Sequence, residues 1–194
     1  MFLRTVKPSL TIVGLGNPGA SYAHTRHNAG FMAVDALSKA FGTGPWKYSS
    51  KYQSDIQEAR IVAAPVLLVK PRTFMNLSGQ AAGSIVDFYK LQPADALLAI
   101  CDDVDLPLGT LRMRTSGSAG THNGLKSLVD RFGESFARLR IGIGPKPEGA
   151  DLATWVLCTL LPEEQRALGE AFVKIPDIVR EFVLGSNGTS GRKS

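Results

Sequence analysis

The chain has 194 residues and a net charge of +5, with 44% hydrophobic and 20% charged residues. This length predicts one domain, or two at most, and this composition excludes a mainly disordered chain. The two cysteines, Cys101 and Cys158, are too few for a disulfide-rich secreted scaffold or a cysteine-based zinc site. No apolar run reaches the ~18 residues that a membrane-spanning helix needs, so we expect no membrane association.

The N-terminal region has no feature typical of a secretory signal. Its apolar stretch, residues 10–13, is too short for the hydrophobic core of a signal peptide. We therefore expect a cytoplasmic protein.

The positive charge is concentrated in one part of the sequence. Residues 110–146 hold seven basic and two acidic residues, which accounts for the whole net charge of +5. The remainder holds 15 of each sign, because 22 basic residues less seven and 17 acidic residues less two both leave 15. Such a basic stretch predicts a binding site for a polyanion, although a solvated charged face would have the same composition.

Strand-like and helix-like stretches alternate in the first half of the chain. The apolar run 10–15 predicts a buried strand, and apolar residues at helical spacing over 31–41 predict a helix. Two further strands are predicted at 52–62 and 66–69. Ser78 can cap the N-terminus of a helix that ends before Pro93.

The alternation continues in the second half. Residues 96–101 predict a strand that runs into an acidic segment, and 110–114 predict an edge strand. A helix opens at Asn123 or Gly124, and residues 139–143 predict another strand. Pro162 starts a helix, and Pro176 starts or kinks a last one.

This order of elements predicts the fold class. We expect an α/β fold over residues 1–194 as a single domain, with a twisted, mixed but mostly parallel sheet surrounded by helices. The segment 185–194 is rich in glycine, serine and asparagine and is expected to be a flexible tail.

The first loop after a predicted strand reads Gly-Leu-Gly-Asn-Pro-Gly over residues 14–19. It matches the glycine pattern of dinucleotide-binding folds, but that site also needs a helix within the glycines and an acidic residue at the end of a second strand. Asp35, at about the right spacing, falls inside a predicted helix. We therefore expect a sharp turn that exposes Asn17 at the edge of the sheet.

Two further segments offer groups for acid–base chemistry. His27 lies in a polar loop before a helix, where a satisfied surface histidine is the common alternative; His24 could join it as a metal ligand, but no third ligand stands at the usual spacing. Asp102 follows a strand within an acidic run. That run fails the calcium-loop pattern, which leaves a magnesium site or a carboxylate that orients a histidine.

Two asparagines stand at loop–helix junctions. Asn76 lies in the segment 73–79 and Asn123 in the segment 117–124, which is inside the basic stretch. Each could be a helix cap. Each could instead donate to a carbonyl or an oxyanion and position a water molecule.

Six short motifs follow one another along the chain: Gly-Leu-Gly-Asn-Pro-Gly, Thr-Arg-His-Asn-Ala-Gly, Phe-Met-Asn-Leu-Ser-Gly, Asp-Asp-Val-Asp-Leu-Pro, His-Asn-Gly-Leu-Lys and Arg-Leu-Arg-Ile-Gly-Ile-Gly-Pro. Together and in this order they closely resemble the bacterial-type peptidyl-tRNA hydrolases, over residues 10–181. The resemblance implies an enzyme that cleaves the ester between peptide and tRNA and frees the tRNA for translation. It implies a monomer that needs no metal, cofactor or protein partner.

The resemblance also implies roles for individual residues. His27 corresponds to a catalytic base and Asp102 to its carboxylate partner. The residues that correspond to the substrate-binding set are Asn17, Tyr22, Asn28, Phe74, Asn76 and Asn123. Those that correspond to a clamp for the tRNA phosphate at the acceptor stem, or stand beside it in sequence, are Arg112, Arg114, Lys126 and Arg140.

Two alternatives and one further expectation accompany this interpretation. A catalytically inactive RNA-binding relative of the same fold is the main alternative, and a dinucleotide-dependent oxidoreductase is the other. Arg138 is expected to face the same side of its strand as Arg140 and to be able to compensate for it.

Overall fold

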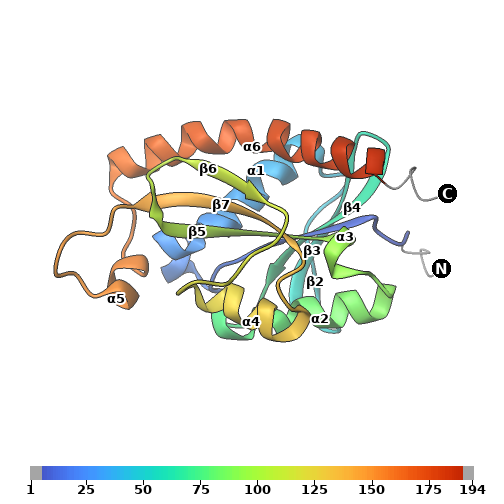
Figure 1. Cartoon of the computed structure of the whole chain (residues 1–194), viewed down its shortest axis with the longest axis horizontal. Helices are drawn as coiled ribbons and strands as arrows, with labels where there is room; N and C mark the ends of the chain where they lie inside the picture. Colours follow the sequence, from blue (N-terminus) through green and yellow to red (C-terminus); the bar gives the residue numbers. More distant parts are fainter. Residues whose placement is uncertain (1–5, 190–194) are drawn as a thin grey trace.

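The computed structural model describes residues 6–189 and shows a seven-stranded sheet flanked by helices (Figure 1). The strands are β1 (Leu10–Gly14), β2 (Lys47–Ser49), β3 (Ser54–Ile61), β4 (Ala64–Pro71), β5 (Leu97–Pro107), β6 (Leu111–Arg114) and β7 (Ala137–Gly144). The α-helices are α1 (Ala29–Phe41), α2 (Ser78–Tyr89), α3 (Pro93–Ala96), α4 (Asn123–Phe132), α5 (Leu152–Val156) and α6 (Pro162–Thr189). Three 3-10 turns are η1 (Ala20–Tyr22), η2 (Arg26–Asn28) and η3 (Met75–Leu77).

The sheet has the order β2-β3-β4-β1-β5-β7-β6 and is parallel in its centre. β1 pairs in parallel with β4 and β5, and β5 pairs in parallel with β7. The remaining neighbours, β2 with β3, β3 with β4 and β6 with β7, are antiparallel. The predicted fold class, an α/β domain with a mixed and mostly parallel sheet, is therefore confirmed.

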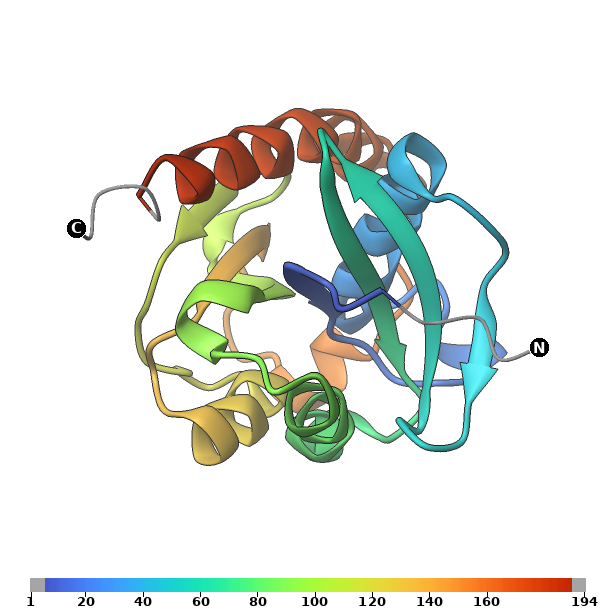
Figure 2. The same ribbon diagram turned by 90° about the vertical axis from the view of Figure 1, so that its right-hand side faces the viewer.

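Helices cover both faces of the sheet. Figures 1 and 2 show α1 and α6 on one face, and α2 and α4 on the other. Side chains alternate between the two layers, as pleated strands require: on β5, Leu98 and Ile100 pack toward α1 and α6, whereas Leu97 and Ala99 pack toward α2 and α4. Asp102 continues the first of these two rows.

Several element boundaries differ from the sequence-based expectation. β5 extends through the acidic run to Pro107, because Cys101, Asp102 and Asp103 pair in register with β7. Ser78 does not cap α2; its hydroxyl donates to the Met75 carbonyl at 2.8 Å.

The C-terminal region forms one long helix. α6 contains Pro176 in its interior, so that proline does not start a separate helix. The helix continues through Gly185 to Thr189, within the segment expected to be a tail, and residues 190–194 lie outside the described part. No helix in residues 6–189 combines the length and the apolarity that crossing a membrane requires.

Arg138 shares its sheet face with Arg140, as expected, but it is completely buried. Its guanidinium donates to four carbonyls, those of Gly117, Ser118, Glu134 and Phe136, and it stacks on the Phe136 ring at 4.3 Å. The expectation that Arg138 could compensate for Arg140 is therefore wrong. The side chain of Arg138 holds residues 117–118 in place through their carbonyls, and it is too deeply buried to reach a ligand.

The start of α1 lies unusually close to the sheet at Gly30. A Cβ atom at this position would stand 2.3 Å from the Ile100 carbonyl oxygen and 2.5 Å from that of Leu15. Only glycine permits this approach, which brings the segment before α1 against the carboxyl ends of β1 and β5.

We expect Gly30→Ala to lower the free energy of unfolding by roughly 1–3 kcal/mol, because the methyl group overpacks a backbone contact. Urea unfolding followed by circular dichroism measures this. Gly169→Ala is the matched control: a Cβ there meets nothing within 4 Å, and alanine favours the helix interior. Equal effects of the two changes would contradict the close-packing argument.

Candidate active site

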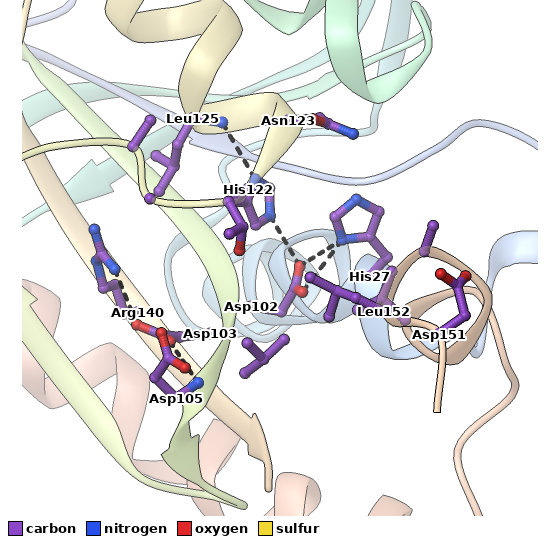
Figure 3. A pocket seen from close by; sticks show the side chains of 16 residues that line it. His27, Asp102, Asp103, Asp105, His122, Asn123, Leu125, Arg140, Asp151 and Leu152 are labelled. Atoms are coloured by element: carbon purple, nitrogen blue, oxygen red, sulfur yellow. Dashed lines mark hydrogen bonds and ion pairs between the residues drawn. The ribbon is translucent and has the colours of Figure 1, made fainter. Parts of the chain in front are cut away.

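A cavity of about 270 Å³ opens where the central parallel strands end. In open α/β sheets this edge is where sites form. The cavity is bounded by the end of β5, the loop before α4 and the short helix α5 (Figure 3). Its lining residues with polar groups include His27, Asp102, Asp103, His122, Asn123 and Arg140.

Asp102 is the centre of the site and is 3% exposed. His27 Nδ1 lies 2.9 Å from Asp102 Oδ1 and 3.2 Å from Oδ2. His122 Nε2 lies 3.0 Å from Asp102 Oδ1 (Figure 3). Because α1 and α4 lie on opposite faces of the sheet, the histidines before their first turns reach the same carboxylate from opposite sides.

The hydrogen bonds determine which ring nitrogens carry protons. His122 Nδ1 accepts from the backbone N–H groups of Gly124 and Leu125, at 3.1 and 3.2 Å, and thereby caps α4. Its proton therefore lies on Nε2, which donates to Asp102. An ionised carboxylate only accepts, so His27 also donates, from Nδ1. In the neutral ring, His27 Nε2 is then the nitrogen without a proton, and it lies on the ring edge away from Asp102, toward Asn123 (Figure 3).

The Asp102 carboxyl is ionised despite its burial. Desolvation alone would raise its pKa, but the charge interaction and hydrogen bond of His122, together with those of His27, outweigh it and lower the pKa of Asp102 well below 3.8. The site therefore contains a buried fixed negative charge with two imidazole donors.

Asn17 is held in a defined orientation after β1. Asn28 accepts from the Asn17 backbone N–H at 2.9 Å and donates to the Asn17 carbonyl at 3.0 Å. The Asn17 Oδ1 atom accepts from the Met75 backbone N–H at 2.9 Å, which leaves Nδ2 as the end that can donate to a ligand. Asn28 is 2% exposed and uses both ends of its amide in this pair, so it is placed to orient Asn17 rather than to contact a ligand.

The remaining predicted substrate-binding residues differ in position. Asn123 is exposed and lines the cavity, as the first residue of α4. Asn76 and Phe74 are also exposed, in and beside η3, and Tyr22 is half-buried in η1; these three do not line the cavity. Neither Asn76 nor Asn123 caps a helix through its side chain.

The predicted basic clamp lies on the last two strands and α4. Arg140 lines the cavity, donates to Asp103 Oδ2 at 3.0 Å and also donates to the Ser118 carbonyl at 2.9 Å. Arg112 is its register partner on β6 and is exposed, as are Arg114 and Lys126. Of these four residues, only Arg140 lines the cavity.

His122 is the residue whose role the sequence analysis missed. The available signal was its place directly before a predicted helix start, together with the scarcity of histidine in this chain, which has three. Helix caps are usually serine, threonine, aspartate or asparagine, so the asparagine next to it is the more obvious candidate.

Cys101 does not supply a nucleophile. Burial raises the pKa of its thiol far above its ordinary value, so the group stays protonated and neutral.

His27, Asp102 and His122 form the one cluster in residues 6–189 whose ligand atoms lie close enough to hold a metal, within 4.8 Å of one another. The hydrogen bonds do not fit that use. A metal on His122 Nε2 would force the proton onto Nδ1, where two backbone N–H groups already donate.

Comparison with known proteins identifies the family of the chain. Residues 11–191 match the family described as peptidyl-tRNA hydrolase. A peptidyl-tRNA hydrolase of Chloroflexus aggregans is 49% identical over 173 residues, covering 89% of this chain and 91% of its own length. One from a Synechococcus species is 48% identical over 158 residues, covering 81% of this chain and 69% of its own.

A solved structure shows the same fold. The crystal structure of peptidyl-tRNA hydrolase from Acinetobacter baumannii matches with a TM-score of 0.82 at 35% identity, and the match covers 94% of each chain. The family match spans nearly the whole chain. The chain therefore belongs to the peptidyl-tRNA hydrolase family.

Proposed function

We propose that this protein hydrolyses the ester that joins a peptide to the 3′-terminal ribose of tRNA, and that it does so in the cytoplasm as a monomer. The observation that carries the proposal is the His27–Asp102 pair, in which the unprotonated His27 Nε2 is the edge of the ring away from the carboxylate. Family membership supports the choice of substrate.

His27 is the general base of the proposed reaction. Its Nε2 takes a proton from a water molecule, which attacks the ester carbonyl. Asp102 fixes the ring through Nδ1 and stabilises the imidazolium that forms. The proton then passes to the leaving ribose oxygen, which departs as a hydroxyl, and the peptide leaves as a carboxylic acid that releases its own proton to solvent. His122 keeps the Asp102 carboxylate in place while His27 changes its protonation state.

The amide groups serve the substrate. The Nδ2 group of Asn17, whose oxygen is held by Met75, can donate to a peptide carbonyl. Asn76 is the side-chain candidate for the developing oxyanion, and Asn123, beside the free edge of His27, can hold the attacking water. A metal is not required, because the ribose oxygen is an adequate leaving group when it takes up a proton as the ester bond breaks.

The basic residues are the proposed contact with the tRNA acceptor stem. Arg140 lines the cavity, and the exposed Arg112, Arg114 and Lys126 lie on neighbouring elements. Phosphate contacts position a nucleic acid but carry no sequence information. This suits an enzyme that accepts many tRNAs.

We expect His27→Ala to lower kcat by about 10²–10⁴ with little change in tRNA affinity, because the ring acts in the transition state. Peptide release from a purified N-blocked aminoacyl-tRNA, followed over time, measures this. An equal loss of binding and turnover would contradict the role of His27 as base. An inactive wild type that still binds tRNA would favour a purely RNA-binding protein.

Asp102→Asn should lower turnover between about 10- and 10⁴-fold, since the amide cannot stabilise the imidazolium. It should also change the dependence of stability on pH. The lowered pKa of Asp102 means that its ionised form stabilises the fold fully above 3.8, and this stabilisation is lost as the pH falls toward the folded-state pKa. Urea unfolding between pH 2 and 5 should therefore show a weaker dependence in Asp102→Asn. Asp105→Asn is the control, and an identical pH dependence of the two variants would contradict this assignment.

Arg140→Ala should weaken binding of full tRNA by roughly 10- to 100-fold, from the loss of charge-assisted hydrogen bonds. Arg114→Ala should act in the same direction. The effect should nearly vanish on a short substrate that carries only the acylated 3′ end. The slope of tRNA affinity against salt should fall by about one unit for each phosphate contact removed.

Arg180→Ala is the charge-matched control, because Arg180 lies on α6 and pairs with Asp177 on the surface. Arg138 is unsuitable for this test, since removing a fully buried guanidinium changes the fold itself. Equal losses on long and short substrates would show that Arg140 acts on the acylated 3′ end and not on the phosphates of the acceptor stem, which would refute the clamp.

A further inference from the structure

Arg26 directly precedes His27 in η2, and its side chain is buried at 6% exposure. It does not line the cavity. Its Nη2 atom donates to both carboxylate oxygens of Glu164, at 2.8 and 2.6 Å. Its Nη1 atom lies within 3.4 Å of the Trp155 carbonyl and 3.3 Å of the Cys158 carbonyl, and the guanidinium stacks on the Trp155 ring at 4.9 Å.

All partners of this guanidinium come from one segment, residues 155–164, which ends α5 and begins α6. The backbones of the same two regions are also joined. The Arg26 N–H donates to the Cys158 carbonyl at 3.3 Å, and the Leu160 N–H donates to the His24 carbonyl at 2.9 Å. Glu164 additionally accepts from the Leu161 N–H at 2.7 Å, which orients its carboxylate toward Arg26.

The helix α5 depends on this attachment. It has five residues, and a helix so short is not stable by itself in water. Leu152, Ala153 and Val156 of α5 nevertheless form an apolar wall of the cavity, and Figure 3 shows Leu152 beside His27. The position of this wall relative to the base is therefore set by what holds residues 155–164.

We propose that Arg26 is a positioning residue that holds α5 as the apolar wall for the acyl end of the substrate. The inference rests on the proposed hydrolase function, because it assigns the wall to the group that the ester joins to tRNA. The acyl part lies next to the scissile carbonyl, so it must occupy the space beside His27. An apolar surface there suits the side chain of the last residue of the peptide.

An optical experiment tests the anchor without any need for activity. The chain has two tryptophans, so Trp46→Phe leaves Trp155 as the only reporter. In that background Arg26→Gln should raise the acrylamide quenching constant of Trp155 about 2-fold, because the ring loses its covering guanidinium. Far-UV circular dichroism should not change. Arg180→Gln, the matched change in a surface pair, should leave the quenching as it is.

A kinetic experiment tests the wall. With a short N-blocked aminoacyl ester of the tRNA 3′ end, Arg26→Gln should raise KM about 10-fold while kcat changes by less than about 3-fold. Affinity for uncharged tRNA should not change, since Arg26 does not face the basic clamp. Arg26→Lys, which keeps the charge but loses the planar fork, and Glu164→Gln should raise KM in the same direction by less.

Three results would overturn the proposal. Unchanged quenching in Arg26→Gln would show that the guanidinium does not hold Trp155. An unchanged KM in a variant that shows the expected rise in quenching would show that the wall does not bind substrate. A loss of kcat as large as that of His27→Ala would show that Arg26 supports the base and not the wall.

If Arg26→Gln does not fold, Arg26→Lys and Glu164→Gln carry the same tests. An inactive wild type would reject the proposed function, while the quenching result would still decide the anchor.

Discussion

One buried negative charge organises this molecule. An ionised carboxylate inside a protein costs several kcal/mol unless hydrogen bonds and opposite charge compensate it. Asp102 receives that compensation from His27 and His122, which come from segments in front of helices on opposite faces of the sheet. The segments before both helices must therefore approach Asp102, in the middle of β5, within hydrogen-bonding distance. The close backbone contact at Gly30 and the ring cap on α4 are the local features that make this approach work.

The sequence was sufficient for those features that depend on local periodicity. The alternation of strands and helices and the parallel centre of the sheet follow from apolar runs and turn residues, whereas the pairing of His27 with Asp102 was implied by the family resemblance. It was insufficient where a side chain acts through tertiary contacts. His122 caps a helix with a ring nitrogen, Arg138 is buried although its residue type is usually exposed, and Asn28 binds the backbone of Asn17. No local pattern encodes such partners, because each is defined by a segment distant in sequence.

Three arginines hold the segments around the cavity by a common principle. Arg138 and Arg140 bind carbonyls of residues 117–118, and Arg26 binds the carbonyls of Trp155, in α5, and of Cys158, just after it. Loop carbonyls lack the partners that helices and strands supply, and the planar guanidinium offers five donors to satisfy them. Arg140 and Arg26 each also have a carboxylate partner, whereas the hydrogen-bond partners of Arg138 are all carbonyls. Desolvation lowers the pKa of Arg138. The carbonyl oxygens offset the burial of its charge. The loop segments beside the cavity are thus held by guanidinium groups, in addition to the strands and helices that bound it.

Asp102 and Asp103 are neighbours on β5, but their carboxylates have different kinds of partner. Asp102 is buried and is hydrogen-bonded to two imidazoles, those of His27 and His122. Asp103 instead pairs with Arg140, a permanent cation that lines the same cavity. An anion that binds Arg140 must compete with the Asp103 carboxylate for this cation. Binding of an anion at Arg140 therefore costs part of the Arg140–Asp103 interaction, which offsets some of the gain from the new charge pair.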